Sequence, residues 1–226
     1  MKANIFLSKL FDDLNKYKVK YAVLRNYEAL PQKWSNDIDL IIEDEKKIIS
    51  ILTKLLNKIK YDKKIMIKKF FSLTSIILFF EDRNLRLDLF NNISYGWIQY
   101  ANKSYIFKFS KKSNKNFYYV ENNLSNILIL IKEYLAYGLI RKKYNYILFE
   151  DKNIISKHID LVFYDSFSKD MKKKILKLCF KKNYKFSLIF KLNKYFNLKN
   201  IVFWGLFRYG TFKQYNLSYM NKIYCD

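Results

Sequence analysis

The chain has 226 residues, and its 43 Lys and Arg against 20 Asp and Glu give a formal net charge of +23. Half of the residues are hydrophobic, enough for a packed core, while 4 Gly and 1 Pro exclude a collagenous chain or a long Gly/Pro-rich linker. A surface this basic attracts anions such as nucleotides, nucleic acid, phosphorylated sugars or acidic lipid headgroups. Joint over-use of Lys, Asn, Ile, Tyr and Phe indicates codon bias as an alternative cause of the charge.

Cysteine usage and hydropathy bear on the compartment. Cys179 and Cys225 lie far apart without CxxC spacing, so they indicate neither a disulfide framework nor a zinc site, and a reducing cytoplasm fits them best. The N-terminus lacks the apolar run and small-residue cleavage site of a signal peptide. No stretch approaches the ~20 apolar residues that span a bilayer. We therefore expect a cytoplasmic protein.

The predicted elements begin with a helix over residues 6–14, where apolar side chains recur at helical spacing. Residues 20–25 and 38–42 are predicted strands, joined by a loop over residues 27–35 that holds the only proline. The acidic run 43–45 predicts the start of a second helix, because acidic side chains stabilise a helix N-terminus.

Residues 64–91 change character. Their runs of Ile, Phe and Leu predict three consecutive antiparallel strands, over residues 65–70, 75–80 and 85–90. Residues 105–109 and 116–120 are predicted to form a further strand pair. The sequence thus predicts an α+β arrangement up to about residue 120.

From residue 122 the pattern is helical. Apolar residues from Leu124 to Leu135 predict an amphipathic helix with Asn123 as its N-cap. Three more helices are predicted, over residues 154–163, 169–180 and 186–195. The composition therefore divides the chain into an α+β domain over residues 1–120 and a basic, aromatic-rich helical region over residues 121–226.

Three aspartates form the candidate site. Asp37 and Asp39 are two residues apart at a predicted strand, so their side chains project to the same side. Asp88 shares a strand face with Arg86, and a neighbouring strand would place it beside the pair. Mg²⁺ prefers such oxygen ligands, with Mn²⁺ as an alternative. The competing interpretation is that Asp-x-Asp arises often by chance and that polar residues of a half-buried strand simply face solvent.

The order of these elements resembles the nucleotidyltransferase superfamily typified by DNA polymerase β. The superfamily signature is a Gly-[Gly/Ser] pair, a spacer, an Asp-h-[Asp/Glu]-h strand (h, hydrophobic) and a later strand with a third Asp. Nucleotidyltransferase-like proteins of bacterial surface-polysaccharide gene clusters resemble the chain more closely. The matching residues are Tyr21, Val23, Leu24, Arg25, Asn26, Tyr27, Glu28, Leu30 and Pro31, then 36–42 and 86–90.

This resemblance implies a nucleotidyltransferase-like mixed β-sheet flanked by helices, followed by a C-terminal helical extension. It implies Mg²⁺-dependent transfer of a nucleotidyl group from a nucleoside triphosphate to a small acceptor, such as a sugar or sugar phosphate of surface-polysaccharide synthesis. Asp37, Asp39 and Asp88 would then be the catalytic metal ligands, and Asp88 would also help to deprotonate the acceptor.

The chain departs from the signature at one point, where Arg25 and Asn26 replace the Gly-[Gly/Ser] pair. Arg25, Asn26 and Arg86 are the predicted phosphate-binding residues, since an arginine supplies charge-assisted contacts to phosphate. The departure leaves open a catalytically inactive relative that acts as a nucleotide-binding, regulatory or antitoxin-like module.

Basic and aromatic residues alternate in the C-terminal half, as in residues 181–186 and 203–209. A helical bundle with a solvated basic face is the first interpretation, and peripheral contact with an anionic membrane at its inner face is the second. Nucleic-acid binding is the weakest, because no recognition motif is evident. A basic membrane or nucleic-acid adaptor therefore remains an alternative function. The only histidine, His158, is interpreted as a packing or surface residue.

Overall fold

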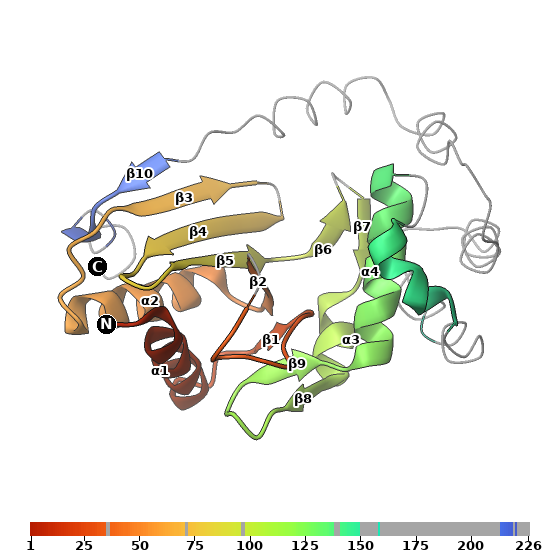
Figure 1. The fold of residues 1–226 in the computed structure, drawn as a ribbon, viewed down its shortest axis with the longest axis horizontal. Coiled ribbons are helices and arrows are strands. Elements are labelled where there is room, and N and C mark those ends of the chain that lie inside the picture. The colour runs from red at the N-terminus through yellow and green to blue at the C-terminus, as the bar shows by residue number, and fades with distance from the viewer. Residues whose placement is uncertain are drawn as a thin grey trace. The chain divides into compact units, whose positions relative to one another are not determined.

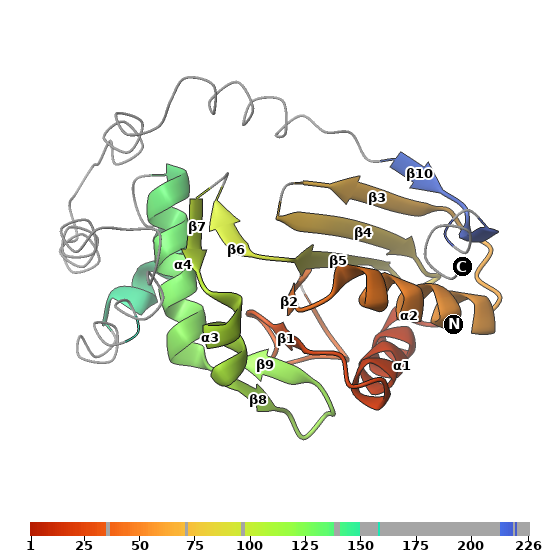
Figure 2. The same cartoon turned by 180° about the vertical axis from the view of Figure 1, so that it is seen from behind.

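The computed structural model describes residues 1–34, 37–70, 72–95, 98–137, 141–149, 158, 213–218 and 220. These residues form an α+β fold with an eight-stranded mixed sheet and four α-helices, shown from two opposite sides in Figures 1 and 2. The chain divides into two compact units. The first unit comprises Met1–Asn92, Ser110–Val120 and Gly210–Asp226, and the second comprises Ile93–Phe109 and Glu121–Tyr209.

The first unit contains the eight-stranded sheet and two helices, α1 (Ala3–Lys16) and α2 (Glu45–Lys58). The strands run in the order β10-β3-β4-β5-β2-β1-β9-β8. Neighbours are antiparallel except β2 with β5 and β1 with β9, which are parallel. The strand bounds are β1 Tyr21–Val23, β2 Ile38–Ile42, β3 Ile65–Lys69, β4 Leu73–Phe79, β5 Asn84–Phe90, β8 Ser110–Lys112, β9 Tyr118–Val120 and β10 Lys213–Tyr215.

Helices α1 and α2 pack their apolar stripes on one face of this sheet. Strand alternation sends every second side chain of β5 into the same core, including Leu85, Leu87 and Leu89. Asp44 caps α2 by accepting a hydrogen bond from the backbone N–H of Lys47 at 3.0 Å. The polar residues of β2 and β5 are therefore left on the opposite face of the sheet.

A segment from far along the chain completes one sheet edge. Strand β10 pairs antiparallel with β3 (Figure 1), and Met220 after it is only 1% exposed in the core formed with α1 and α2. Tyr215 and Leu217 pack against the same core. The fold of the first unit thus includes residues near position 220.

The second unit contains the hairpin β6 (Ile93–Tyr95) and β7 (Ile98–Ala101). Its helices are α3 (Lys103–Lys108), α4 (Asn122–Tyr137) and the 3-10 helix η1 (Lys142–Phe149).

Two buried polar side chains of this unit, Glu133 and His158, have polar partners. Arg141 donates two hydrogen bonds of 2.6 Å to Glu133, whose side chain is 1% exposed. His158 is buried, with Nδ1 3.0 Å from the Tyr105 hydroxyl and its ring edge-on to Phe109, as expected of a packing residue.

The structure confirms the predicted α+β class, the first two helices and the strands near residues 21, 38, 65, 75 and 85. The strand predicted over residues 105–109 is wrong, because Tyr105 and Ile106 lie in α3 and β9 pairs with β8 instead. Asn102 accepts a hydrogen bond from the Ser104 N–H at 2.8 Å, and this cap starts the helix. The predicted N-cap Asn123 is also wrong, since α4 begins at Asn122.

Other predictions fall on parts of the chain that the structure does not describe. The helices predicted over residues 154–163, 169–180 and 186–195 lie outside the described residues, His158 excepted. The C-terminal helical extension and the domain boundary at residue 120 stay predictions.

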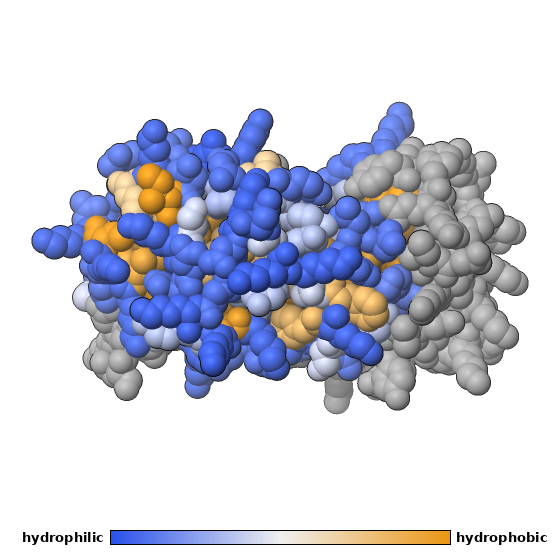
Figure 3. Space-filling model, turned by 90° about the horizontal axis from the view of Figure 1, so that it is seen from below, coloured by the Kyte–Doolittle hydropathy of each residue, from blue (hydrophilic) through white to orange (hydrophobic). Residues whose placement is uncertain are grey.

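One face of the molecule is drawn as a surface in Figure 3. Hydrophilic residues cover most of the described part of the face in Figure 3, with small hydrophobic areas between them. Within the described ranges, no helix is long and apolar enough to cross a membrane. Among the residues that the structure describes, the exposed large hydrophobic side chains are those of Met1, Ile5, Tyr17 and Tyr118.

Candidate metal centre

Strand register brings the predicted aspartates together. β2 and β5 are parallel neighbours, and Asp39 lies directly opposite Asp88 in their register. Both side chains point away from the helix-covered core, and each residue is only 4% exposed. Asp37 immediately precedes β2 and lies two residues before Asp39, so it projects to the same side. The grouping predicted from the sequence is therefore present.

The three carboxylates are close enough to share one cation. One carboxylate oxygen from each of Asp37, Asp39 and Asp88 lies within 4.8 Å of the other two. An all-oxygen donor set suits a hard divalent ion such as Mg²⁺ or Mn²⁺, whereas zinc sites usually include His or Cys. Among the described residues, no other group of three or more His, Cys, Asp and Glu has such a geometry. The residues present thus fit the predicted cofactor.

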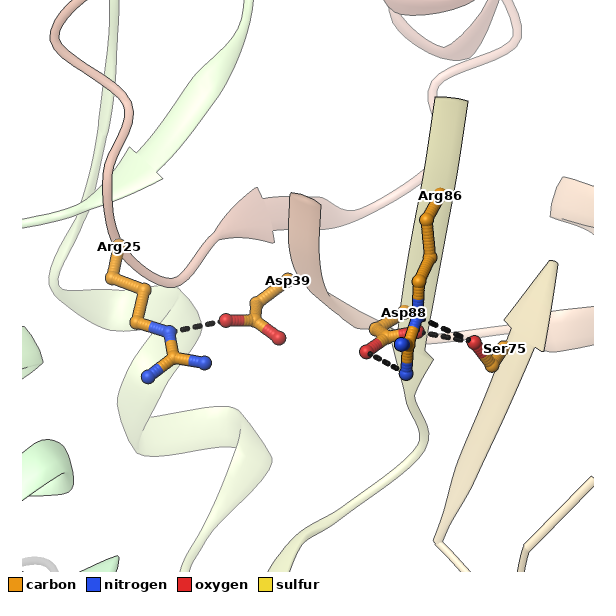
Figure 4. A network of polar contacts seen from close by, with 5 residues as sticks. All are labelled: Arg25, Asp39, Ser75, Arg86 and Asp88. Atoms are coloured by element: carbon orange, nitrogen blue, oxygen red, sulfur yellow. Dashed lines mark hydrogen bonds and ion pairs between the residues drawn. The ribbon is translucent and has the colours of Figure 1, made fainter. Parts of the chain in front are cut away.

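Two arginines already neutralise the buried carboxylates. Arg25, on the segment after β1, donates from Nε to Asp39 Oδ2. Arg86 donates from Nε to Asp88 Oδ1 at 3.0 Å and from Nη2 to Asp88 Oδ2 at 3.1 Å. In Figure 4 each guanidinium group lies against its own carboxylate. Within the described residues, Asp37 forms no ion pair of this kind.

Ser75 is a site residue that the sequence analysis missed. It lies on β4 directly opposite Asp88, is fully buried, and donates from Oγ to Asp88 Oδ1 at 2.5 Å. Ser75 Oγ in turn accepts a hydrogen bond from Arg86 Nε at 3.0 Å (Figure 4). The predicted turn at residues 81–84 did not reveal it, because the structure pairs Phe79 with Asn84, and only this register sets Ser75 opposite Asp88.

The surroundings of Asp37 disfavour its ionised form. Partial burial raises the pKa of Asp37 above its usual value, and the nearby charges of Asp39 and Asp88 raise it further. Arg25 and Arg86 oppose this increase in pKa. The ionised form of Asp37 is therefore unfavourable where it lies, and a bound cation would remove that penalty.

The predicted phosphate-binding residues are only partly brought together. Arg25 and Arg86 lie beside the carboxylates, but the side chain of Asn26 is exposed and contacts none of them among the described residues. Asn26 has φ of 56°, a left-handed conformation that glycine adopts freely and asparagine tolerates better than most residues. The backbone thus keeps a glycine-compatible turn where the resembled signature has Gly-[Gly/Ser].

Comparison of the chain with protein-family models, with curated proteins and with solved structures finds no match. The coarser conclusion stands on the geometry: an α+β mixed sheet carries a group of three carboxylates, two of them buried, that could hold a divalent cation. The activity is therefore a matter for proposal.

Proposed function

We propose that the protein is a Mg²⁺-dependent nucleotidyltransferase that transfers a nucleotidyl group from a nucleoside triphosphate to a small acceptor. The convergence of Asp37, Asp39 and Asp88 from two parallel neighbouring strands carries this proposal. The order of an Asp-h-Asp strand, a helix and a later strand with a third Asp supports it through resemblance. Mn²⁺ would serve as an alternative cation.

Each residue has a role in this proposal. Asp37, Asp39 and Asp88 hold the cation, which when bound neutralises phosphate charge and orients the phosphate for attack. Asp88 also accepts the proton of the attacking hydroxyl. Ser75 fixes the Asp88 carboxylate through the hydrogen bond to Oδ1. The guanidinium groups of Arg25 and Arg86 donate hydrogen bonds to the phosphates.

The acceptor is proposed on resemblance alone. Residues 20–42 and 84–91 resemble proteins of surface-polysaccharide gene clusters, which favours a sugar or sugar phosphate as acceptor. The net charge of +23 supports an anionic substrate and peripheral contact with the inner face of an anionic membrane.

Pyrophosphate release from each of the four nucleoside triphosphates, measured with Mg²⁺ and a panel of sugar phosphates, tests this function. Wild type is expected to release pyrophosphate with at least one pair, and the double variant Asp37→Ala/Asp39→Ala is expected to lose that activity. Asp62→Ala is a control, since it removes an exposed carboxylate elsewhere in the same unit. Equal Mg²⁺-nucleotide binding by wild type and the double variant would refute the metal site.

A second candidate is a non-catalytic nucleotide-binding module. The pairing of Asp39 with Arg25 and of Asp88 with Arg86 favours it, because these carboxylates are neutralised without a cation. Such a module would bind nucleotide to the same extent with Mg²⁺ and with EDTA, and would release no pyrophosphate. An adaptor would instead bind anionic vesicles or nucleic acid with a steep salt dependence that both aspartate substitutions leave unchanged.

A further inference from the structure

The arginines and a divalent cation would compete for the same carboxylate oxygens. Arg25 holds Asp39 Oδ2, and Arg86 holds both oxygens of Asp88. These are two of the three carboxylates that are close enough to share a cation. A cation can reach them fully only if the guanidinium groups give up part of their hydrogen bonding.

The charges of the group favour a paired exchange. Its three carboxylates outnumber its two guanidinium groups by one, so the formal charge is negative without a cation and positive with a divalent one. A guanidinium group that releases a carboxylate keeps its fork of N–H donors, which matches the oxygens of a phosphoryl group. The cation-loaded group is thus suited to an anion.

We propose that Arg25 and Arg86 are internal counter-ions that turn from the carboxylates to a phosphoryl group when the carboxylates take up a divalent cation. The site therefore takes a cation together with a phosphoryl group much more tightly than it takes either one alone. This inference rests on the proposed function and specifies how its phosphate-bearing substrate is bound.

Each ligand alone meets a specific obstacle. A bare cation must weaken the ion pairs of Asp39 and Asp88, both only 4% exposed, and would cost the guanidinium groups part of their hydrogen bonding. An anion alone meets the three carboxylates and arginines that are already engaged. Binding both together satisfies carboxylates and guanidinium groups at once, so the two affinities are coupled and by linkage the coupling is reciprocal.

Calorimetric titration of the full chain with Mn²⁺ tests the coupling without any nucleotide. Sulfate serves as the tetrahedral dianion, and a chloride buffer of equal ionic strength is the reference because charge screening is then the same. The Mn²⁺ dissociation constant is expected to fall by about fivefold or more in sulfate, at the lower end of typical allosteric coupling.

Two charge-matched variants identify the arginine. Arg25→Gln removes a guanidinium group from the site and should bind Mn²⁺ in chloride at least as tightly as wild type, while losing most of the sulfate effect. Arg83→Gln removes the same charge from the exposed turn between β4 and β5 and should keep the wild-type factor. Arg25→Lys retains a positive charge beside Asp39 and should keep part of the sulfate effect. This variant tests the proposal if Arg25→Gln does not fold.

The outcomes separate the two proposals. Equal Mn²⁺ affinity in sulfate and chloride would overturn the coupling and leave the metal site standing. A sulfate effect that survives in Arg25→Gln, or that Arg83→Gln also abolishes, would overturn the role of Arg25. Absence of Mn²⁺ binding under every condition would overturn the proposed function itself, and the coupling with it.

Discussion

Replacing Asp37 with Asn should stabilise the cation-free protein and weaken its binding of metal. The substitution keeps the shape of the side chain and removes a carboxylate whose pKa is raised by burial and by its neighbours Asp39 and Asp88. Two carboxylates within 4.8 Å of each other repel by about 3 kcal/mol at an effective dielectric constant of ~20. Arg25 and Arg86 oppose this repulsion, and Asp37 is partly exposed.

These terms leave Asp37→Asn with a free energy of unfolding higher than that of wild type by on the order of 1 kcal/mol, after discounting for solvent screening. For a chain of 226 residues that gain raises Tm by about 2–4 °C. The sign follows from the raised pKa. A carboxyl group with a folded pKa above its unfolded value contributes stability below the unfolded pKa and loses it as pH rises through the folded pKa. The advantage of Asp37→Asn should therefore be larger at neutral pH than in acid, where it vanishes.

Metal should reverse the order of stability. At a hundredfold excess of Mn²⁺ over its dissociation constant, binding stabilises wild type by about 2.7 kcal/mol, which raises Tm by about 5–10 °C. The Asp37→Asn protein should gain much less. Differential scanning calorimetry in EDTA and in Mn²⁺ measures both terms, with Asp62→Asn as an exposed control. A wild type more stable than Asp37→Asn in EDTA at neutral pH would refute the electrostatic reasoning.

Three further predictions concern other residues. Ser75→Ala removes the hydrogen bond to Asp88 and should weaken Mn²⁺ binding by about tenfold in titrations, while Ser75→Thr should restore part of it. Arg141→Met leaves Glu133, 1% exposed, without its cation and should lower the free energy of unfolding in urea by about 2 kcal/mol, a value discounted because Arg141 is partly exposed. Glu133→Leu in the same protein should recover most of that loss. Met220→Ala should cost about 2–5 kcal/mol in urea unfolding, and a negligible effect would contradict its place in the core.

Local patterns made much of the first unit predictable. Strand β2 was predicted with its observed bounds, because turn-forming and acidic residues flank its apolar run. The hairpin of β4 and β5 was predictable from two apolar runs separated by the polar turn 81–84. The structure starts β5 at Asn84, inside the predicted turn, so the pairing of these strands was predictable but their register was not.

Long-range pairing was not predictable in the same way. Strand β10 has only three residues, Lys213–Tyr215, and joins β3 from the far end of the chain. Strands β6 and β7 are also short and carry little periodic signal. Residues 105–108 have strand-like composition, yet the Asn102 cap and burial of Ile106 favour the helix α3. The short strands thus lacked a local signal, while in α3 a local cap and burial outweighed the strand-like composition.

The site was predictable in its acids but not in their partners. Asp37 and Asp39 share a side by strand periodicity alone, and the parallel pairing of β2 with β5 then brings Asp88 opposite Asp39. Arg25 was expected at a phosphate, and the structure instead pairs it with Asp39. Sequence spacing could not reveal this pair, because Arg25 lies on a segment without regular structure whose path depends on the fold.

That pairing bears on what the carboxylates are for. A buried ion pair often contributes little net stability, because desolvation of both charges offsets their attraction. Stability is therefore a weak explanation for the charges on this face, which form the pairs Arg25–Asp39 and Arg86–Asp88. Asp37 makes the structural explanation weaker still, because its ionised form is unfavourable where it lies. A divalent cation accounts for all three carboxylates at once, since it turns their mutual repulsion into binding affinity.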